Sequence, residues 1–259
     1  MGWQARLESI RVNNTSGAGE LAREAAEAAW DWLEHAQPAS LAPWMAEVTA
    51  FAQALHRAQP SMAPLFNLAN EILLAVESAS TLPRAQDAVR AVVQTFPTHL
   101  VRSQEALLAA TLPLLSPGAR ILTFSYSSSV LAVLLAAQAR QIPLQVLCTE
   151  GRPMLEGRRF AQRLAQAGVP VRFGVDAAVS TFASQASLAL LGADSLTAGG
   201  VMNKLGTTGV ALACGMSKLP CYVVCGRQKW VPAAASAAAF LRLEAPGEVW
   251  DDPAPGVEV

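Results

Sequence analysis

The chain has 259 residues, in which 19 lysines and arginines nearly balance 20 aspartates and glutamates, so its formal net charge is -1. Hydrophobic residues make up 52% of the sequence and charged residues 15%. This apolar balance predicts a large buried sheet or an extensive subunit interface. Because the chain has no overall basic field and no polybasic run, we expect neither direct nucleic-acid binding nor attraction to an anionic membrane surface.

The apolar stretches are short. The segment from Val130 to Ala137 is among the longest, far below the ~20 residues that a membrane-spanning helix needs. The first residues also lack the apolar segment of a secretory leader, so we expect none. These features predict a protein without membrane association.

The four cysteines are expected to be buried, reduced thiols that pack as small hydrophobic side chains. Their spacing matches no zinc-binding pattern, and we expect no metal and no cofactor. Reduced thiols favour a cytoplasmic location. The cysteines are Cys148, Cys214, Cys221 and Cys225.

The sequence before Pro97 is rich in alanine and has helical periodicity. Residues 20–34 (ELAREAAEAAWDWLE) predict a helix with Trp30 and Leu33 on an apolar face. Further helices are expected at residues 44–57, 64–76 and 83–112. Pro97 falls inside the last of these, where proline should bend or interrupt the helix.

After Pro117 and Gly118 the pattern changes to strand and helix in alternation. Short apolar runs predict buried parallel strands at residues 119–124, 144–149, 169–174, 187–192 and 219–225, with helices at 128–140, 155–167 and 205–218. Such alternation favours a parallel sheet with right-handed crossovers and helices on both faces. The predicted fold is therefore α/β, with a helical N-terminal domain at residues 1–117 and a Rossmann-like parallel-sheet domain at 118–259.

Ligands of parallel sheets bind beyond the carboxyl ends of the strands, so the residues that follow each strand carry the functional argument. The first strand is followed by a hydroxyl cluster that opens a helix, from Ser125 through Ser127 to Ser129. Serine hydroxyls and helix N–H groups suit an anion such as phosphate. The simpler interpretation is that one serine caps the helix.

The second and third strands are each followed by a charged residue. Arg152 follows the second strand, where it can grip phosphate bidentately or pair with Glu150. Asp176 follows the third strand, and capping of the next helix is its favoured role.

The segment after the fourth strand, GADSLTAGGVMNKLGTTG, is the most informative. Asp194 stands at the strand end beside a glycine-bearing loop, and Asn203 and Lys204 precede a helix. A carboxylate that faces an amide, an ammonium and a helix N-terminus suits a phosphorylated polyol, because the carboxylate takes a proton while the positive groups hold phosphate. Lys229 follows the last strand and adds a second ammonium.

These motifs, in this order, resemble one family. From about Ala119 to Trp230 the chain is similar to proteins related to the α, β and δ subunits of initiation factor two B, which include ribose-1,5-bisphosphate isomerase and methylthioribose-1-phosphate isomerase. The similarity rests on TFSYSSS, TEGRPMLEGRRFAQRLAQAGVPV, DAAV and GADSLTAGGVMNKLGTTGVALA. It implies a helical domain, a Rossmann-like domain and a homodimer or higher oligomer.

The resemblance assigns roles to the matching residues. Asp194 matches the catalytic aspartate of the isomerases, and Asn203 and Lys204 match their substrate-holding pair. Further ligand-contacting positions are matched by Gly17, Ala18 and Lys229. With Ser127 and Arg152 as phosphate ligands, these residues form the candidate site.

Two positions depart from the family pattern. Ser125 occupies the stretch where the isomerases place a catalytic cysteine, and Gln59 stands in place of an arginine. A cysteine with a pKa of about 8.5 exchanges protons near neutrality, whereas a serine hydroxyl hardly does so without a strong base. Loss of the arginine also removes a bidentate phosphate clamp. The three histidines, His35, His56 and His99, match no catalytic position.

Three functions stay open at this point. The favoured one is a binding or regulatory protein that keeps a pocket for a sugar phosphate or nucleotide. The second is an aldose-1-phosphate to ketose isomerase that works through Asp194 and an unidentified acid, with Ser125 at the candidate catalytic position of the isomerases' cysteine. The third is a non-catalytic assembly subunit, comparable to the translation-factor subunits, which also lack the cysteine. Cys148 ends a strand beside the site but is expected to be a packed thiol, and we assign it no role.

Overall fold

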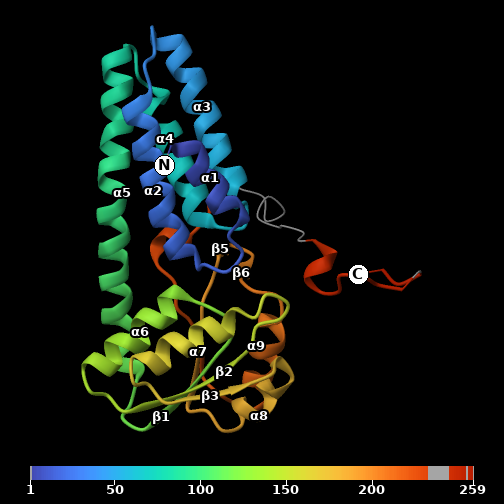
Figure 1. The fold of residues 1–259 in the computed structure, drawn as a ribbon. Coiled ribbons are helices and arrows are strands. Elements are labelled where there is room, and N and C mark those ends of the chain that lie inside the picture. The colour runs from blue at the N-terminus through green and yellow to red at the C-terminus, as the bar shows by residue number, and fades with distance from the viewer. Residues whose placement is uncertain (1, 233–244, 255, 259) are drawn as a thin grey trace. The chain divides into compact units, whose positions relative to one another are not determined.

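A computed structural model describes residues 2–232, 245–254 and 256–258 (Figure 1). The chain forms two compact units, and the units are not continuous in sequence. Among the described residues, the first unit holds 2–106, 194–202 and 226–232, and the second holds the remainder. Each unit is described by itself. The division into domains at residue 117 stays a prediction.

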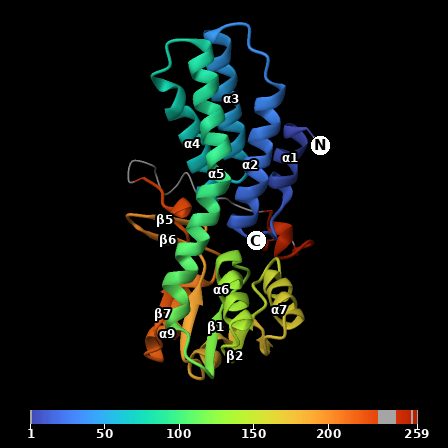
Figure 2. The same ribbon diagram turned by 90° about the vertical axis from the view of Figure 1, so that its left-hand side faces the viewer.

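The first unit is built mainly from helices that run side by side (Figure 2). They are α1 (Trp3–Val12), α2 (Ala18–His35), α3 (Leu41–Ala58), α4 (Ala63–Glu77) and α5 (Leu82–Thr111), the last of which belongs to this unit up to Ala106. The helices expected at residues 20–34, 44–57 and 64–76 are therefore present, and α1 is an additional element. No helix among the described residues is long and apolar enough to span a membrane.

An aromatic stack lies at the centre of the helical core. The ring of Trp32 is parallel to those of Phe51 and Trp44, with centroid distances of 4.3 and 5.2 Å. Leu33 is buried as expected, but Trp30 is 37% exposed, and its expected place on the apolar face is wrong. The buried stripe of α2 passes through Trp32 instead, and Arg90 lies over the outward ring of Trp30.

Helix α5 runs through Pro97 without a break, so of the bend or interruption expected there, the interruption does not occur. Proline removes one helical hydrogen bond and costs about 3 kcal/mol in a helix interior. Val89, Val93, Phe96 and Leu100 on the same helix are buried in the core. Burial of each such side chain contributes roughly 1.5–3 kcal/mol, which offsets the cost of the proline.

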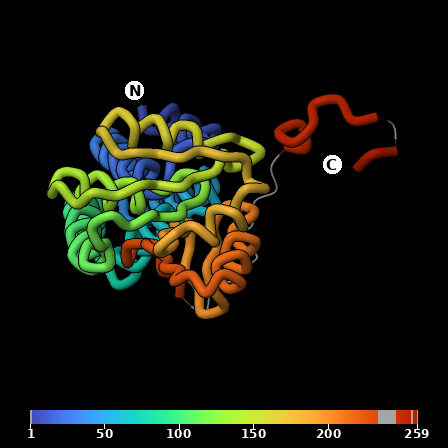
Figure 3. The backbone as a smooth tube through the Cα atoms, turned by 90° about the horizontal axis from the view of Figure 1, so that it is seen from below, coloured from blue at the N-terminus to red at the C-terminus, as the bar shows by residue number. Residues whose placement is uncertain are grey.

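The second unit contains a five-stranded parallel sheet with the order β3-β2-β1-β4-β7. The strands are β1 (Ala119–Thr123), β2 (Leu144–Thr149), β3 (Val171–Gly174), β4 (Leu188–Leu191) and β7 (Cys221–Val223). The connecting helices are α6 (Ser128–Ala139), α7 (Glu156–Gln166), α8 (Val179–Ala183) and α9 (Thr207–Met216). The chain path of the neighbouring strands is visible in Figure 3. The predicted α/β fold is confirmed.

Alternate residues of the strands face opposite layers. Val146, opposite Ile121 in the β1–β2 register, belongs with it to the apolar cluster that includes α6 and α7. The next register pair, Leu122 and Leu147, packs in the cluster that includes α8 and α9. The central strands β1, β2 and β4 are thus covered on both faces, which explains why they read as nearly continuous apolar runs.

A small antiparallel hairpin in the first unit was not expected. Its strands are β5 (Ser195–Thr197) and β6 (Gly200–Met202), and they occupy the segment that the sequence pattern suggests is a glycine-bearing loop. Gly200 has φ +139°, a backbone conformation that other residues rarely adopt. Met202 packs with Ala63 and Val231, which fixes the hairpin on the N-terminal end of α4.

The cysteines are all free thiols. Cys148 and Cys214 are buried as expected, whereas Cys225 is half-buried and Cys221 is exposed. Burial of Cys221 was therefore a wrong expectation. The reason is the place of β7 at the edge of the sheet, where its side chains are not covered.

Candidate functional site

The carboxyl edge of the sheet is where a parallel sheet is expected to hold a ligand. Strands β1 and β4 are neighbours in the sheet. From β1 the chain continues to β2 on one side of this pair, and from β4 it continues to β7 on the other side. Such a switch point opens a crevice beyond the strand ends. Ser125 and Gly192 closely follow these two strands.

Ser125 is held in an unusual backbone conformation. Its φ is +59°, and the residue is only 5% exposed. A non-glycine residue persists in this region only when the surrounding structure holds it there. Gly151, with φ +70°, lies against it, since a Cβ atom on Gly151 would be 3.1 Å from the Cα of Ser125. The hydroxyl is therefore placed at the strand end by two tight turns.

Ser127 caps helix α6. Its Oγ accepts a hydrogen bond of 3.3 Å from the backbone N–H of Val130, as the capping interpretation of the serine cluster expects. A side chain at Gly192 would overlap the Ser127 hydroxyl, so glycine is needed where β4 ends. A Cβ atom at Gly192 would also be 3.8 Å from Oδ1 of Asn203. Ser127 and Asn203 thus lie on the same side of this edge.

Asp176 stabilises the loop after β2 and does not cap a helix. Its carboxylate accepts hydrogen bonds from the backbone N–H groups of Gly151 and Arg152, at 2.9 and 2.7 Å. The following short helix is preceded by Val175 and has no side-chain cap, so the favoured capping role is wrong. The Arg152 guanidinium is exposed and donates to the carbonyl of Val249 at 3.3 Å. Phosphate binding by Arg152 stays a prediction.

Asn203 and Lys204 lie immediately before helix α9. The amide of Asn203 donates to Oγ1 of Thr207 at 3.0 Å, and that hydroxyl donates to the Lys204 carbonyl at 2.6 Å. Gly206 has φ +98° and lies against the ring of Phe124. This turn directs the helix N-terminus and its two flanking polar side chains towards the carboxyl edge.

Glu156 is a partner of Lys204 that the sequence pattern does not reveal. The Lys204 ammonium lies 2.7 Å from Oε1 of Glu156, and their side chains are 20% and 9% exposed. The next residue, Gly157, has no room for a side chain, because a Cβ atom would overlap the carbonyl oxygen of Thr149. The Glu-Gly pair at the start of a predicted helix is the sequence signal for this close approach.

Several polar atoms at the strand ends are buried without hydrogen-bond partners. They are Oε2 of Glu156 and the hydroxyls of Thr123 and Thr149, the last residues of β1 and β2. Buried polar groups are usually hydrogen-bonded, to protein or to ordered water. This part of the second unit is therefore suited to additional hydrogen-bond donors.

Asp194 and Lys229 belong to the first unit. The backbone N–H of Asp194 donates to Met202 at 2.8 Å, and its carbonyl accepts from Ala63 at 3.2 Å, so the N-terminal end of α4 carries this residue. Lys229 lies in the short helix η3 (Arg227–Lys229) and is 2% exposed. A nearly buried ammonium needs polar partners, which limits where the side chain can lie.

Gly17 and Ala18 begin helix α2, also in the first unit. Gly17 is the N-cap residue, and its N–H donates to Oε2 of Glu20 at 3.4 Å. Ala18 is 2% exposed and is the first residue of the helix. The Gly-Ala turn that opens a helix is therefore present, whereas ligand contact by these residues stays a prediction.

Gln59 has a structural role in the first unit. It is 3% exposed, and its Nε2 donates to the carbonyls of Ile10 and Asn13, at 2.9 and 3.1 Å. These carbonyls lie at the C-terminal end of α1, where the last turn of a helix lacks internal donors. Gln59, which stands in place of the arginine of the family pattern, thus supplies a hydrogen-bond donor to the carbonyls at the C-terminal end of α1.

Cys148 is a packed core thiol, as expected. The side chain is fully buried, and desolvation raises its pKa to about 12. A thiol with such a pKa keeps its proton at neutral pH. Among the described residues, no group of histidine, cysteine, aspartate and glutamate side chains is arranged to hold a metal ion.

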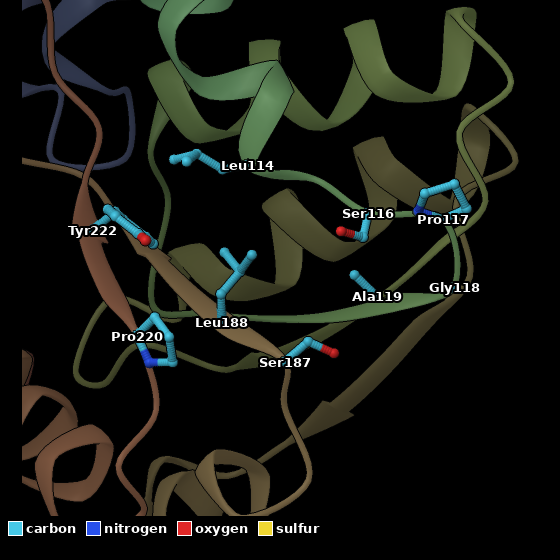
Figure 4. A pocket seen from close by; sticks show the side chains of 9 residues that line it. All are labelled: Leu114, Ser116, Pro117, Gly118, Ala119, Ser187, Leu188, Pro220 and Tyr222. Carbon is cyan, nitrogen blue, oxygen red and sulfur yellow. The ribbon is translucent and has the colours of Figure 1, made fainter.

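A hollow of about 380 Å³ lies at the opposite edge of the sheet (Figure 4). Ala119 and Leu188, at the amino ends of β1 and β4, contribute to its lining with Pro220 and Tyr222. The described residues that line it include no charged side chain and none of the predicted site residues. This hollow is therefore separate from the carboxyl edge.

Comparison with known families gives a match over most of the chain. The "Initiation factor 2 subunit family" matches residues 14–251. A translation initiation factor eIF-2B subunit 2-like protein of Pyrococcus horikoshii is 30% identical over 236 residues, which cover 91% of this chain and 82% of that protein. The ribose 1,5-bisphosphate isomerase of Archaeoglobus fulgidus is 28% identical over 87% of this chain and 71% of the isomerase.

Solved structures agree with these sequence matches. The crystal structure of the Pyrococcus horikoshii translation initiation factor eIF-2B is similar with a TM-score of 0.84 and 27% identity, over 94% of this chain and 84% of that one. The tetrameric eIF2B-beta2-delta2 complex of C. thermophilum contains a chain with a TM-score of 0.75, 16% identity and coverage of 91% and 79%. At this identity the second likeness concerns the fold.

Proposed function

Because the chain belongs to the Initiation factor 2 subunit family, we propose that it binds a sugar phosphate or nucleotide as a regulatory protein and does not catalyse isomerisation. The observation that carries this proposal is Ser125, which stands at the strand end where the family's isomerases place a cysteine. Its hydroxyl is buried and held in a strained turn. Without a strong base, a serine does not exchange protons near neutral pH as a cysteine does.

The loss of the arginine at Gln59 supports the same conclusion. The Gln59 amide is used on the backbone carbonyls of α1, and it carries no charge for a phosphate. A bidentate clamp is therefore absent at this position, so the chain departs from the isomerase pattern at a second position. We propose binding roles for Asp194 and Lys229 in the first unit, and for Asn203 and Lys204 in the second.

The unpartnered polar atoms of the second unit support a ligand at the carboxyl edge. Ser127 opens α6, and Asn203 and Lys204 precede α9. The N-termini of these helices favour negative charge. Buried hydroxyls at Thr123 and Thr149 offer further acceptors and donors. A phosphorylated polyol presents both kinds of group.

Calorimetric titration with ribose 1,5-bisphosphate, methylthioribose 1-phosphate and AMP tests the proposal, with NMR of each mixture to detect a ketose product. We expect at least one ligand to bind without turnover. Lys204→Ala should weaken binding by about tenfold or more, since it removes one charge-assisted hydrogen bond. Lys218→Ala is the matched control, because Lys218 is exposed beyond the C-terminal end of the same helix. Absence of binding by all three ligands contradicts the proposal.

An isomerase would have its own signature. Ketose formation that is lost in Asp194→Asn would show that Asp194 acts as an acid or base. It would also require a proton donor other than Cys148, whose pKa is raised to about 12 by burial. Turnover at a rate that depends on Asp194 therefore replaces the regulatory proposal with catalysis.

An assembly role is favoured by one further observation, an apolar surface on the second unit. Leu205, Leu212 and Met216 are 82%, 65% and 87% exposed, and Tyr222 and Val223 are exposed on the edge strand β7. Exposed apolar patches of this kind mark interaction sites. We propose a second copy of this chain as the partner, and a homodimer in the cytoplasm as the working form.

Light scattering after size-exclusion chromatography tests the homodimer. Leu212→Asp should convert a dimer into a monomer, because a buried unpaired carboxylate is costly at an apolar interface. Leu74→Asp serves as the control, since Leu74 is exposed on α4 in the first unit. A wild-type protein that is monomeric at all concentrations contradicts the assembly role.

A further inference from the structure

Lys229 lies in a segment that is too short to be stable without contacts to other elements. Helix η3 has three residues, Arg227–Lys229, and two backbone hydrogen bonds of its own close it, from Lys229 N–H to the Gly226 carbonyl and from Trp230 N–H to the Arg227 carbonyl. Short 3₁₀ turns have poor hydrogen-bond geometry and depend on their surroundings. The position of the buried Lys229 is therefore set by neighbouring elements.

Asn67 on α4 supplies one of these supports. Its Nδ2 donates to the carbonyl of Gln228 at 2.7 Å and to the carbonyl of Trp230 at 2.8 Å. These two carbonyls flank Lys229 in the chain. A side-chain amide has two N–H donors, and both are used here, so the peptide groups on either side of Lys229 are held by one residue.

Ser103 on α5 supplies the second support. Its hydroxyl donates to Oε1 of Gln228 at 2.6 Å and accepts from the N–H of Arg227 at 3.1 Å. Gly226 leaves the space for this contact, because a Cβ atom there would overlap Oγ of Ser103 and Oε1 of Gln228. Helices α4 and α5 thus both form hydrogen bonds with Gln228, the residue before Lys229.

The same segment is joined to the strand that follows Asp194. The N–H of Val231 donates to the Leu196 carbonyl at 2.8 Å, and Leu196 and Trp230 form an isolated parallel bridge. The carbonyl of Asp194 in turn accepts from Ala63, one turn before Asn67 on α4. Helix α4 therefore forms hydrogen bonds both with Asp194 and with the segment that contains Lys229.

We propose that Asn67 is a positioning residue for Lys229, with Ser103 as its second support. Asn67 holds the two carbonyls that flank the lysine and so fixes where the ammonium is presented to an anionic ligand. This inference rests on the proposed function, since it takes Lys229 as a group that holds the ligand's phosphate. Asn67 itself is not assigned contact with the ligand.

The lysine content of the chain allows a test that needs no ligand. The chain has three lysines, Lys204, Lys218 and Lys229. Acylation of the native protein with an N-hydroxysuccinimide acetate reagent, followed by mass spectrometry of peptides, reports the rate at each lysine. In the wild type we expect Lys218 to react fast and Lys229 slowly, because Lys229 is 2% exposed.

Asn67→Ala should raise the acylation rate of Lys229 about tenfold relative to Lys218, since local opening of η3 becomes easier by the worth of two hydrogen bonds. Asn70→Ala is the matched control, because Asn70 lies on the same helix and is also half-buried. It should leave the ratio unchanged. Ser103→Ala should raise the Lys229 rate by a smaller factor and provides a second variant should Asn67→Ala fail to fold.

Two outcomes would overturn the proposal. One is an unchanged ratio of Lys229 to Lys218 acylation in both Asn67→Ala and Ser103→Ala. The other is a rise at Lys229 that comes with a loss of Tm large enough to account for it, which would mean that Asn67 only stabilises the first unit as a whole, since Lys204 and Lys218 lie in the second unit. Thermal melting of each variant separates these cases, because positioning changes the ratio without requiring a large shift in Tm.

Titration with ribose 1,5-bisphosphate then joins the inference to the proposed function. Asn67→Ala should weaken the affinity about tenfold, and Asn70→Ala should bind as the wild type does. If the wild type binds no phosphorylated ligand, the proposed function fails, whereas the acylation ratio still decides whether Asn67 positions Lys229. Unchanged affinity in Asn67→Ala, in a wild type that binds, contradicts the positioning role.

Discussion

Lys204 and Glu156 form an ion pair that joins the loop before α9 to the first residue of α7, with Nζ 2.7 Å from Oε1. Lys204 precedes α9, and Glu156 is the first residue of α7. The second carboxylate oxygen, Oε2, is buried without a hydrogen-bond partner. Because a charge removed from water is costly unless it is paired, the two residues depend on each other.

Removal of either partner should therefore destabilise the protein. We expect Glu156→Ala to lower the free energy of unfolding by about 2 kcal/mol, below the range for fully buried pairs because Lys204 keeps some solvent access. Denaturant unfolding measures the loss. In Glu156→Ala/Lys204→Ala the loss should be smaller than the sum of the single losses by about 1 kcal/mol.

A nearby pair with one exposed partner provides the control. Glu150, whose side chain is 16% exposed, lies 3.6 Å from Arg158, whose side chain is 58% exposed. Because the guanidinium keeps its contact with water and the contact is long, the pair should contribute about 0–1 kcal/mol, and Glu150→Ala should have a small effect. Equal losses for Glu150→Ala and Glu156→Ala, or strict additivity in the double variant, would contradict the coupling of Lys204 and Glu156.

Gly157 should tolerate no side chain. A Cβ atom would overlap the carbonyl oxygen of Thr149, which belongs to the backbone and cannot rotate away. We expect Gly157→Ala to cost about 3 kcal/mol, at the level of other strong steric defects. Thermal unfolding followed by circular dichroism measures the effect.

Gly209 is the matched control for this substitution. It lies inside α9, and a Cβ atom there would have nothing within 4 Å. Gly209→Ala should therefore raise the stability by about 0.5–1 kcal/mol, because alanine has the higher helix propensity. Equal destabilisation by both substitutions would show that the contact with Thr149 is not the cause.

Much of the fold follows from local pattern. The strand expected at residues 144–149 is found as Leu144–Thr149, because its apolar run is buried on both faces of the sheet. The hairpin β5–β6 could not be predicted in this way. Its strands have three residues each and depend on contacts with α4, which lies far away in sequence.

The site residues that follow strands are the ones that sequence reasoning can identify. Ser125 and Asp194 are predicted as site residues because strand ends mark ligand positions in parallel sheets, and their contact with a ligand stays a prediction. Glu156 was not recognised, because its partner Lys204 is 48 residues away and only the tertiary structure joins them. Asn67 was missed for the same reason, since its acceptors lie more than 160 residues later.

Gln59 should be needed for the stability of the first unit. Its amide donates to the carbonyls of Ile10 and Asn13 while the side chain is 3% exposed. Gln59→Ala would leave these acceptors without the donor, at a cost of about 2 kcal/mol. Gln53→Ala, at an exposed position of α3, should change the unfolding free energy by less than about 0.5 kcal/mol. Urea titration compares the two variants, and similar midpoints would disprove the capping role.

Cys148 should make stability depend on alkaline pH. Burial raises the pKa of its thiol to about 12 in the folded protein, whereas an unfolded cysteine has a pKa of about 8.5. Above the unfolded value the unfolded chain loses the proton and the folded chain keeps it, so the free energy of unfolding falls as pH rises from about 8.5 to 12, by up to about 1.4 kcal/mol per pH unit. Below that window the thiol is protonated in both states and does not make the stability depend on pH.

The difference between the wild type and Cys148→Ala isolates this contribution, because other alkaline groups titrate equally in both. We expect Cys148→Ala to be less stable at pH 7, since a small buried side chain is shortened, and to lose less stability than the wild type between pH values of about 8.5 and 10.5. Denaturant unfolding at a series of pH values measures both slopes. Parallel slopes would mean that Cys148 ionises as readily in the folded protein as in the unfolded chain, which its complete burial under α6 and α7 argues against.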